Sequence, residues 1–196
     1  RTGVQSSLCT ISAPNGKTVS LREVAMYAVD SEKQQITATA SHTSHTSPPP
    51  FTAQFAEVEV DTETGQINVL KLVAAVDCGV AINPALAEGQ VEGAVTQGLG
   101  FALCEEMVFD ENGKLCNPNF ADYKLFKALD LPKLETILVE TYESTGPYGA
   151  KSIAEVPINC PAPAIANAVS DAVGARITEL PLTAERVLAA LKMTTD

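Results

Sequence analysis

The chain has 196 residues, of which 45% are hydrophobic, so one sizeable domain or two small ones can form around a core. Its formal net charge is -11, which argues against nucleic-acid binding, because a phosphate-binding surface needs clustered Lys and Arg. No apolar run approaches the roughly 20 residues of a membrane span, and the first residues lack a signal-peptide pattern. We therefore expect a cytoplasmic protein that binds neither nucleic acid nor membrane.

Residues 1–50 have the pattern of the tail of a preceding segment that ends in a connector. Val19 to Val29 has a mild helical pattern, which Ser20 can cap with Glu23 three residues on. Residues 35–42 alternate loosely, as a strand does. Residues 41–50 contain only Ser, Thr, His and Pro and end in three prolines, a composition that cannot pack. We place a domain boundary after this connector, with one domain over residues 51–196.

Residues 51–77 predict a β-hairpin. Apolar and acidic residues alternate from Ala56 to Asp61, which is typical of a strand with one wet face. The sequence Thr-Glu-Thr-Gly at 62–65 supplies the turn, because Gly65 can adopt a positive φ. Residues 67–76 return as a second, more apolar strand.

A long helix should begin at Asn83-Pro84 and run to Glu105 or Glu106, with Asn as the cap and Pro at the first helical position. Each interior glycine costs about 0.5–1 kcal/mol relative to Ala. Four glycines inside this one helix indicate that another helix or a ligand approaches the helix backbone closely. Gln90 and Gln97 lie two turns apart on one face and could bind a polar ligand, although tight helix packing with exposed Gln is the alternative that spacing alone favours. The four glycines are Gly89, Gly93, Gly98 and Gly100.

The remaining elements are a second hairpin, a strand and two helices. The stretch before Gly174 carries an apolar stripe at helical spacing, and Gly174 should end that helix. Thr183 can cap the last helix. Hairpins interleaved with helices indicate an α+β fold rather than a doubly wound sheet, and neither a Gly-x-Gly-x-x-Gly nor a Walker pattern is present. The predicted ranges are 107–115 for the hairpin, 136–141 for the strand, and 161–173 and 184–191 for the helices.

Cysteine and histidine give no metal-site pattern. The five cysteines are scattered, odd in number and never spaced Cys-x-x-Cys, so neither a disulfide framework nor a zinc or iron–sulfur site is indicated. Buried reduced thiols in a cytoplasmic protein are the plain interpretation. His42 and His45 lie in the Ser/Thr-rich connector with no third ligand nearby, and solvated histidines are favoured there. We expect no metal ion held directly by side chains of this chain.

Residues 146–157 hold the most unusual carboxylate in the chain. Glu155 stands between Ile153-Ala154 and Val156-Pro157. A carboxylate in so apolar a setting is either turned out to solvent or held in a cleft, and the functional interpretation is a catalytic base. The alternatives are a carboxylate that caps the following helix or pairs with Lys151. These features by themselves support an α+β domain and name no reaction.

Three stretches carry a family resemblance through their order and spacing. Phe-Ala-Glu-Val-Glu-Val-Asp-Thr-Glu-Thr-Gly at 55–65 leads to Asp-Cys-Gly-Val-Ala-Ile-Asn-Pro at 77–84. Gly-Gln-Val-Glu-Gly-Ala-Val-Thr-Gln-Gly-Leu-Gly at 89–100 precedes Glu105-Glu106. Gly-Ala-Lys-Ser-Ile-Ala-Glu at 149–155 precedes an Ala-rich helix. Together they resemble the C-terminal part of the molybdenum-binding subunit of the xanthine dehydrogenase and aldehyde oxidase family, and Gly-Pro-Tyr-Gly-Ala-Lys-Ser at 146–152 is most similar to bacterial purine or nicotinate hydroxylases.

The resemblance implies an oxidoreductase. In that family a molybdenum-bound hydroxide attacks an electron-poor carbon, either beside a ring nitrogen, as in a purine, or in an aldehyde. A hydride passes to the sulfido (or selenido) ligand, and electrons leave through [2Fe-2S] clusters to FAD. The family's glutamate accepts the hydroxide proton, and it matches Glu155. A base must be ionised yet basic enough to take a proton, and apolar surroundings push a carboxylate toward that range.

The resemblance also implies a cofactor site. Gln90 matches a family glutamine that contacts the pterin, and Gly93 and Gln97 continue the same helix face. Ala150, Lys151 and Ser152 match the segment along the pterin, where backbone amides and the Ser152 hydroxyl can donate. Lys151 can equally be a structural ion-pair residue. The implied cofactor is molybdopterin in its cytosine dinucleotide form.

The sequence departs from the family pattern in two ways. Ala154 stands where the family most often has glycine, and this methyl group narrows the pocket beside the base. The family's upstream glycine-rich loop and its purine-orienting arginine have no counterpart, so we expect half of a split subunit or a fragment. The implied partners are the remainder of the molybdenum subunit, an iron–sulfur subunit, an FAD subunit and a small-molecule substrate. The alternatives are a non-catalytic scaffold that kept the fold, or a component of a nicotinate, aldehyde, aromatic-CoA or CO dehydrogenase.

Overall fold

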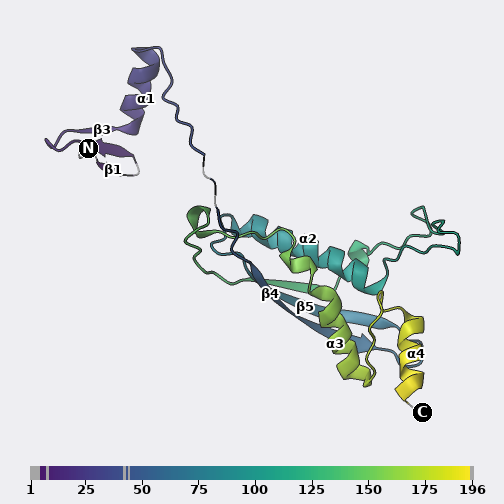
Figure 1. The fold of residues 1–196 in the computed structure, drawn as a ribbon. Coiled ribbons are helices and arrows are strands. Elements are labelled where there is room, and N and C mark those ends of the chain that lie inside the picture. The colour runs from purple at the N-terminus through teal and green to yellow at the C-terminus, as the bar shows by residue number, and fades with distance from the viewer. Residues whose placement is uncertain (1–4, 8, 42, 44, 195–196) are drawn as a thin grey trace. The chain divides into compact units, whose positions relative to one another are not determined.

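The structure is a computed structural model that describes residues 5–7, 9–41, 43 and 45–194. The chain divides into two compact units, residues 1–43 and residues 44–196, and each is described by itself (Figure 1). The domain assignment made from the sequence, with a molybdopterin-binding domain over 51–196, stays a prediction.

The first unit combines a small antiparallel sheet with one helix. Strands β1 (Gln5–Ser7), β2 (Thr10–Ser12) and β3 (Thr18–Ser20) pair in that order. Helix α1 (Leu21–Asp30) follows directly. The hydroxyl oxygen of Ser20 accepts from the backbone N–H of Glu23 at 3.1 Å, and the Glu23 carboxylate accepts from the N–H of Ser20 at 2.8 Å. This capping box satisfies two N–H groups at the helix start and confirms the predicted helix.

The strand predicted at residues 35–42 is wrong over its described part. Residues 35–41 form no strand and are all exposed, and residue 42 lies outside the described residues. Loose alternation indicates a strand, but a strand needs a partner for its N–H and C=O groups, and no described residue pairs with this stretch. In the connector that follows, the described residues also form no helix or strand.

The second unit is built on a three-stranded mixed sheet. Strands β4 (Phe51–Val60) and β5 (Ile67–Asp77) form the predicted antiparallel hairpin, and β6 (Lys133–Leu138) runs parallel to β5 on its other side. Gly65 in the turn has a φ of 76°, as its position in the turn requires. The strand predicted at 136–141 therefore exists, shifted toward the N-terminus.

Helix α2 (Pro84–Leu103) lies between β5 and β6 in the chain. A parallel pair needs such a crossover connection. The side-chain oxygen of Asn83 accepts from the N–H of Leu86 at 3.2 Å, and Pro84 takes the first helical position, so the predicted start is confirmed. The helix ends at Leu103, close to the predicted Glu105 or Glu106.

Of the hairpin predicted at 107–115, the structure contains the turn but not the two strands. The N–H of Gly113 donates to the carbonyl of Asp110 at 3.0 Å, and a single bridge joins Phe109 to Leu115. No strand forms here because two short exposed segments without a third strand gain too little from pairing. A 3₁₀ turn, η1 (Ala128–Asp130), precedes β6.

Two predicted helices close the chain. Helix α3 (Pro161–Val173) ends at Gly174, which has a φ of 71° and donates its N–H to the carbonyl of Ser170. Helix α4 (Ala184–Thr194) begins after Thr183, whose hydroxyl oxygen accepts from the N–H of Arg186. Two further 3₁₀ turns, η2 (Pro147–Gly149) and η3 (Val156–Ile158), flank the segment that carries Glu155.

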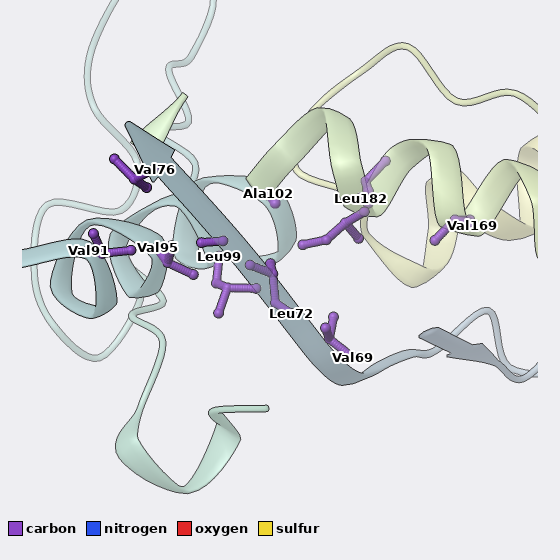
Figure 2. Close-up of a cluster of buried hydrophobic side chains, with 11 residues drawn as sticks. Val69, Leu72, Val76, Val91, Val95, Leu99, Ala102, Val169 and Leu182 are labelled. Atoms are coloured by element: carbon purple, nitrogen blue, oxygen red, sulfur yellow. The ribbon is translucent and has the colours of Figure 1, made fainter. Parts of the chain in front are cut away.

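The core lies between the sheet and the helices (Figure 2). Apolar side chains of β5 meet those of α2 and α3, and Leu182 closes the cluster before α4. Full burial of a residue such as Leu99 contributes about 1.5–3 kcal/mol, so this cluster fixes the sheet against α2. Its residues are Val69, Leu72, Ala74, Val76, Val91, Val95, Leu99, Ala102, Ile165, Val169 and Leu182.

Three of the four glycines of α2 differ in what surrounds them. A Cβ atom on Gly98 would lie 2.5 Å from Cγ of Pro161 and 3.0 Å from the carbonyl oxygen of Ile158, so the start of α3 packs directly on the helix backbone. Gly89 and Gly93, in contrast, are exposed and have no atom within 4 Å of such a Cβ. Tight packing therefore explains Gly98, while the face with Gly89 and Gly93 is open.

Candidate functional site

A hollow of about 460 Å³ opens where the end of β5, the start of α2 and the segment before Glu155 meet. Its wall brings together three parts of the chain that are far apart in sequence. They are Cys78 with residues 80–83, the α2 residues Leu86, Ala87 and Gln90, and residues 150–154.

Backbone pairing holds two of these parts together. The N–H of Lys151 donates to the carbonyl of Cys78 at 2.7 Å, and the N–H of Val80 donates to the carbonyl of Gly149 at 2.9 Å. Gly79 and Gly149 have φ values of 70° and 82°, and a Cβ on Gly79 would collide with the carbonyl oxygen of Gly149. Glycine at 79 is therefore what lets the loop approach the end of β5 this closely.

Side chains reinforce the pairing at the same point. The carboxylate of Asp77 accepts from Nζ of Lys151 at 2.7 Å, from Oγ1 of Thr141 at 2.6 Å and from the N–H of Gly79 at 2.9 Å. Burial acts to raise the pKa of Asp77, but these hydrogen bonds and the charge of Lys151 outweigh it and lower the pKa from 3.8 to about 2. Nζ of Lys151 also lies 5.2 Å from the ring centroid of Phe51.

The backbone N–H groups along the loop fall into two classes. Those of Ala150 and Lys151 already donate, to the carbonyls of Pro147 and Cys78. Those of residues 152–155 find no acceptor among the residues that the structure describes. An N–H group needs a partner once water is excluded, so four consecutive donors beside the hollow are available to a ligand.

Gln90 connects α2 to this loop. Its side-chain amide donates to the carbonyl of Ala154 at 3.3 Å, which leaves its side-chain oxygen as an acceptor at the edge of the hollow. Gln97 and Gly93 lie further along the exposed face of α2 and do not line the hollow. The structure thus brings Gln90 together with residues 150–152, and it leaves Gly93 and Gln97 outside.

Glu155 follows directly after Ala154, the last residue of the loop that lines the hollow. Its side chain is exposed and makes no capping hydrogen bond to η3. Lys151 pairs with Asp77 instead of with Glu155. Helix capping and pairing with Lys151 are therefore not realised in the described part of the chain, and the exposed side chain agrees with the third alternative, a carboxylate turned out to solvent. An unpaired carboxylate beside the hollow can accept a proton from a ligand there.

Two residues of this region were not singled out as site candidates from the sequence. The Asp77 carboxylate anchors the loop, and the side-chain amide of Gln54 in β4 donates to the carbonyl of Pro157 at 2.7 Å. The only available signal for Asp77 was an acid at the end of an otherwise apolar strand. For Gln54 no local signal existed, because its partner lies 103 residues away.

Direct metal ligation by side chains has no site in the described residues. They contain no group of three or more His, Cys, Asp or Glu side chains placed to hold a metal ion. Cys78 lines the hollow, and burial raises the pKa of its thiol, so the thiol stays protonated. Within the same residues, every helix is too short or too polar to cross a membrane.

Known proteins resemble this chain over most of its length. It is 38% identical over 187 residues to the xanthine dehydrogenase molybdenum-binding subunit of Escherichia coli O157:H7, an alignment that covers 94% of this chain and 25% of that protein. Reconstituted CO dehydrogenase from Oligotropha carboxidovorans superposes with a TM-score of 0.80 at 26% identity, over 98% of this chain and 25% of that one. Quinoline 2-oxidoreductase from Pseudomonas putida 86 has a TM-score of 0.65 at 34% identity, over 69% and 18% of the two chains.

The chain therefore spans about a quarter of the length of the xanthine dehydrogenase molybdenum-binding subunits that it matches. The family model for the molybdopterin cofactor-binding domain matches residues 4–132, a range that includes Gln90 and ends before Glu155. These matches identify the chain as a member of the molybdopterin cofactor-binding domain family of the molybdenum hydroxylases.

Proposed function

We propose that this chain supplies one wall of a molybdopterin site and the catalytic carboxylate of a molybdenum hydroxylase. The observation that carries the proposal is a hollow lined by Gln90 and residues 150–154, where N–H groups without an acceptor among the described residues begin at Ser152 and Glu155 follows next in the chain. The whole enzyme would then need the remainder of the molybdenum subunit, since this chain spans about a quarter of its relatives.

The donor set of the hollow fits the edge of a pterin. Such an edge alternates hydrogen-bond acceptors and donors. The N–H groups of residues 152–155 and the hydroxyl of Ser152 can donate to its oxygens and ring nitrogens, while the side-chain oxygen of Gln90 can accept. The apolar wall from Val80 to Ile82 offers contact to a flat ring. Lys151 contributes its place in the loop, because its charge is already paired with Asp77.

When bound, the cofactor supplies the metal centre at which water-derived oxygen reaches an electron-poor carbon and electrons leave the substrate. The task of Glu155 is to accept a proton at a carboxylate oxygen. No described residue forms an ion pair with Glu155, so both of its carboxylate oxygens can face a ligand. A positioned general base contributes typically 10²- to 10⁴-fold to a rate. Ala154 places a methyl group beside this base and narrows the space for substrate.

The substrate we propose is an N-heterocycle of purine type or an aldehyde. Sequence similarity to a xanthine dehydrogenase subunit and to quinoline 2-oxidoreductase supports the first class. We further propose the cytosine dinucleotide form of the cofactor, with [2Fe-2S] clusters and FAD on partner subunits or domains. Carbon monoxide is the substrate named for another structural relative, so the same wall serves different substrates and the remaining part of the subunit must select among them.

Replacement of Glu155 by Gln in the complex assembled with its partner subunits tests the proposal. Turnover should fall by about 10²-fold or more, the magnitude of a lost general base, while molybdenum and pterin content stay unchanged. Glu140→Gln is the matched control, since Glu140 is also exposed and lies outside the hollow. Near-normal turnover of the Glu155 variant would contradict its role as the base. An assembled complex without molybdenum would favour a non-catalytic scaffold instead.

A further inference from the structure

The ion pair between Asp77 and Lys151 is the most withdrawn from solvent among the described ion pairs. The side chain of Lys151 is 9% exposed and that of Asp77 is 16% exposed, whereas both partners of every other pair are at least 27% exposed. Removing two charges from water is unfavourable, and hydrophobic residues of similar volume often stabilise a fold as well or better. Stability alone therefore does not account for an ion pair at this position, since apolar side chains could supply it as well.

The ion pair lies at the point in the loop where backbone hydrogen bonds to β5 end. Up to Lys151 the backbone is hydrogen-bonded to the end of β5. Beyond Lys151 come the N–H groups of residues 152–155, which have no acceptor among the described residues. The next contacts that hold the loop are the bonds of Gln90 to Ala154 and of Gln54 to Pro157. Lys151 is thus the last anchor before the unpaired donors begin.

The anchor is rigid because each partner is held from several sides. Two further donors, Oγ1 of Thr141 and the N–H of Gly79, fix the carboxylate of Asp77. The ring of Phe51 lies against the ammonium group of Lys151. A carboxylate fixed by three hydrogen bonds holds its ammonium partner in one geometry, as preorganised sites require.

We propose that Asp77 and Lys151 are positioning residues, whose ion pair holds residues 152–155 at a fixed place beside the hollow. The inference rests on the proposed function, since it assigns this segment to the cofactor. Lys151 acts through Asp77 and the backbone, and its ammonium group does not contact the cofactor. Loss of the pair loosens the donors and Glu155 together, without changing the sheet or the core.

The test compares Asp77→Asn, Lys151→Met and Lys151→Arg in the assembled complex. Asp77→Asn keeps the shape of the side chain and removes its charge, and Lys151→Arg restores the ion pair. The matched control is Lys71→Met, which breaks the 2.6 Å pair between Lys71 and Glu135 on the same strand β5. Hydrogen exchange of backbone amides, molybdenum retention during dialysis, and kcat and KM are measured for each variant.

In Asp77→Asn and Lys151→Met, the amides of Val80, Ala150 and Lys151, whose hydrogen bonds hold the loop at the end of β5, should exchange at least tenfold faster in cofactor-depleted protein. Molybdenum should be lost severalfold faster, and kcat should fall more than KM rises. Amides of β4 and α3 should exchange as in Lys71→Met, and Lys151→Arg should recover most of the effect. Unchanged exchange at Val80, Ala150 and Lys151, or equal acceleration throughout the second unit, would overturn the inference.

A second variant tests the same inference, and the metal content of the complex tests the proposed function separately. If Asp77→Asn fails to fold, Thr141→Val removes a single donor to Asp77 and should cause a smaller change at the same amides, and no change there would count against the inference. If the wild-type complex contains no molybdenum, the proposed function fails. The exchange measurement still decides whether the ion pair positions the loop.

Discussion

Replacement of Gly98 by Ala should destabilise the chain, whereas the same replacement at Gly93 should stabilise it. Both residues lie inside α2, where Ala is favoured over Gly by about 1 kcal/mol. The difference comes from their neighbours. A Cβ on Gly98 would lie 2.5 Å from the ring of Pro161 and 3.0 Å from the carbonyl oxygen of Ile158, while one on Gly93 would meet open space.

The magnitude follows from these contacts. Overpacking a well-filled site costs typically 1–3 kcal/mol. The upper part of that range, about 2–3 kcal/mol, applies at Gly98, because a proline ring cannot rotate away and Ile158 contributes backbone. Subtracting the helix preference of about 1 kcal/mol leaves a net loss of about 1–2 kcal/mol for Gly98→Ala. Gly93→Ala should gain about 0.5–1 kcal/mol.

Urea unfolding of the full chain, followed by far-ultraviolet circular dichroism, measures both changes. The two variants should differ in unfolding free energy by roughly 1.5–3 kcal/mol, with opposite signs relative to wild type. The design is internally controlled, since both substitutions add one methyl group to one helix. If Gly98→Ala proves as stabilising as Gly93→Ala, the start of α3 does not rest on the backbone of α2.

Two further predictions concern the end of β5. The pKa of Asp77 is lowered from 3.8 to about 2, so its ionised form contributes about 2 kcal/mol of stability above pH 5, and this contribution is lost as the pH falls through 4 toward 2. In urea titrations, the difference in unfolding free energy between wild type and Asp77→Asn should shrink over that pH range. A difference that stays constant would refute the lowered pKa of Asp77. Gly79→Ala forces a Cβ into the carbonyl oxygen of Gly149 at a φ of 70°. It should lower stability by about 1–3 kcal/mol and perturb the amide resonances of residues 149–151, and unperturbed resonances would show that the close approach is absent.

Local signals in the sequence carried most of the secondary structure. Ser20 with Glu23, Asn83 before Pro84, and Gly174 each act within a few residues, so the helix ends that they mark could be predicted. The alternation at residues 35–42 failed as evidence for a strand because pairing depends on a partner elsewhere. The three-residue strands β1 to β3 were missed because so few residues carry no readable period.

The candidate site was predictable only in part. Residues alone singled out Glu155 as an odd carboxylate, and the family resemblance assigned it a role together with Gln90 and residues 150–152, roles that stay predictions. The anchoring role of Asp77 was not foreseen, because its partner lies 74 residues away. Distant side-chain contacts leave no trace in local pattern, and a three-dimensional arrangement is needed to find them.

The side-chain hydrogen bonds that hold the loop beside the hollow also determine when the hollow can form. They join residues that are 64, 74 and 103 positions apart in the chain. The β4–β5 hairpin and α2 use near neighbours and can form early, whereas contacts of such long range close large loops and form late. During synthesis the wall from Cys78 to Gln90 is complete long before Lys151 has been added. The hollow can therefore form only after residues 150–154 have been added, later than the β4–β5 hairpin and α2 on which they dock.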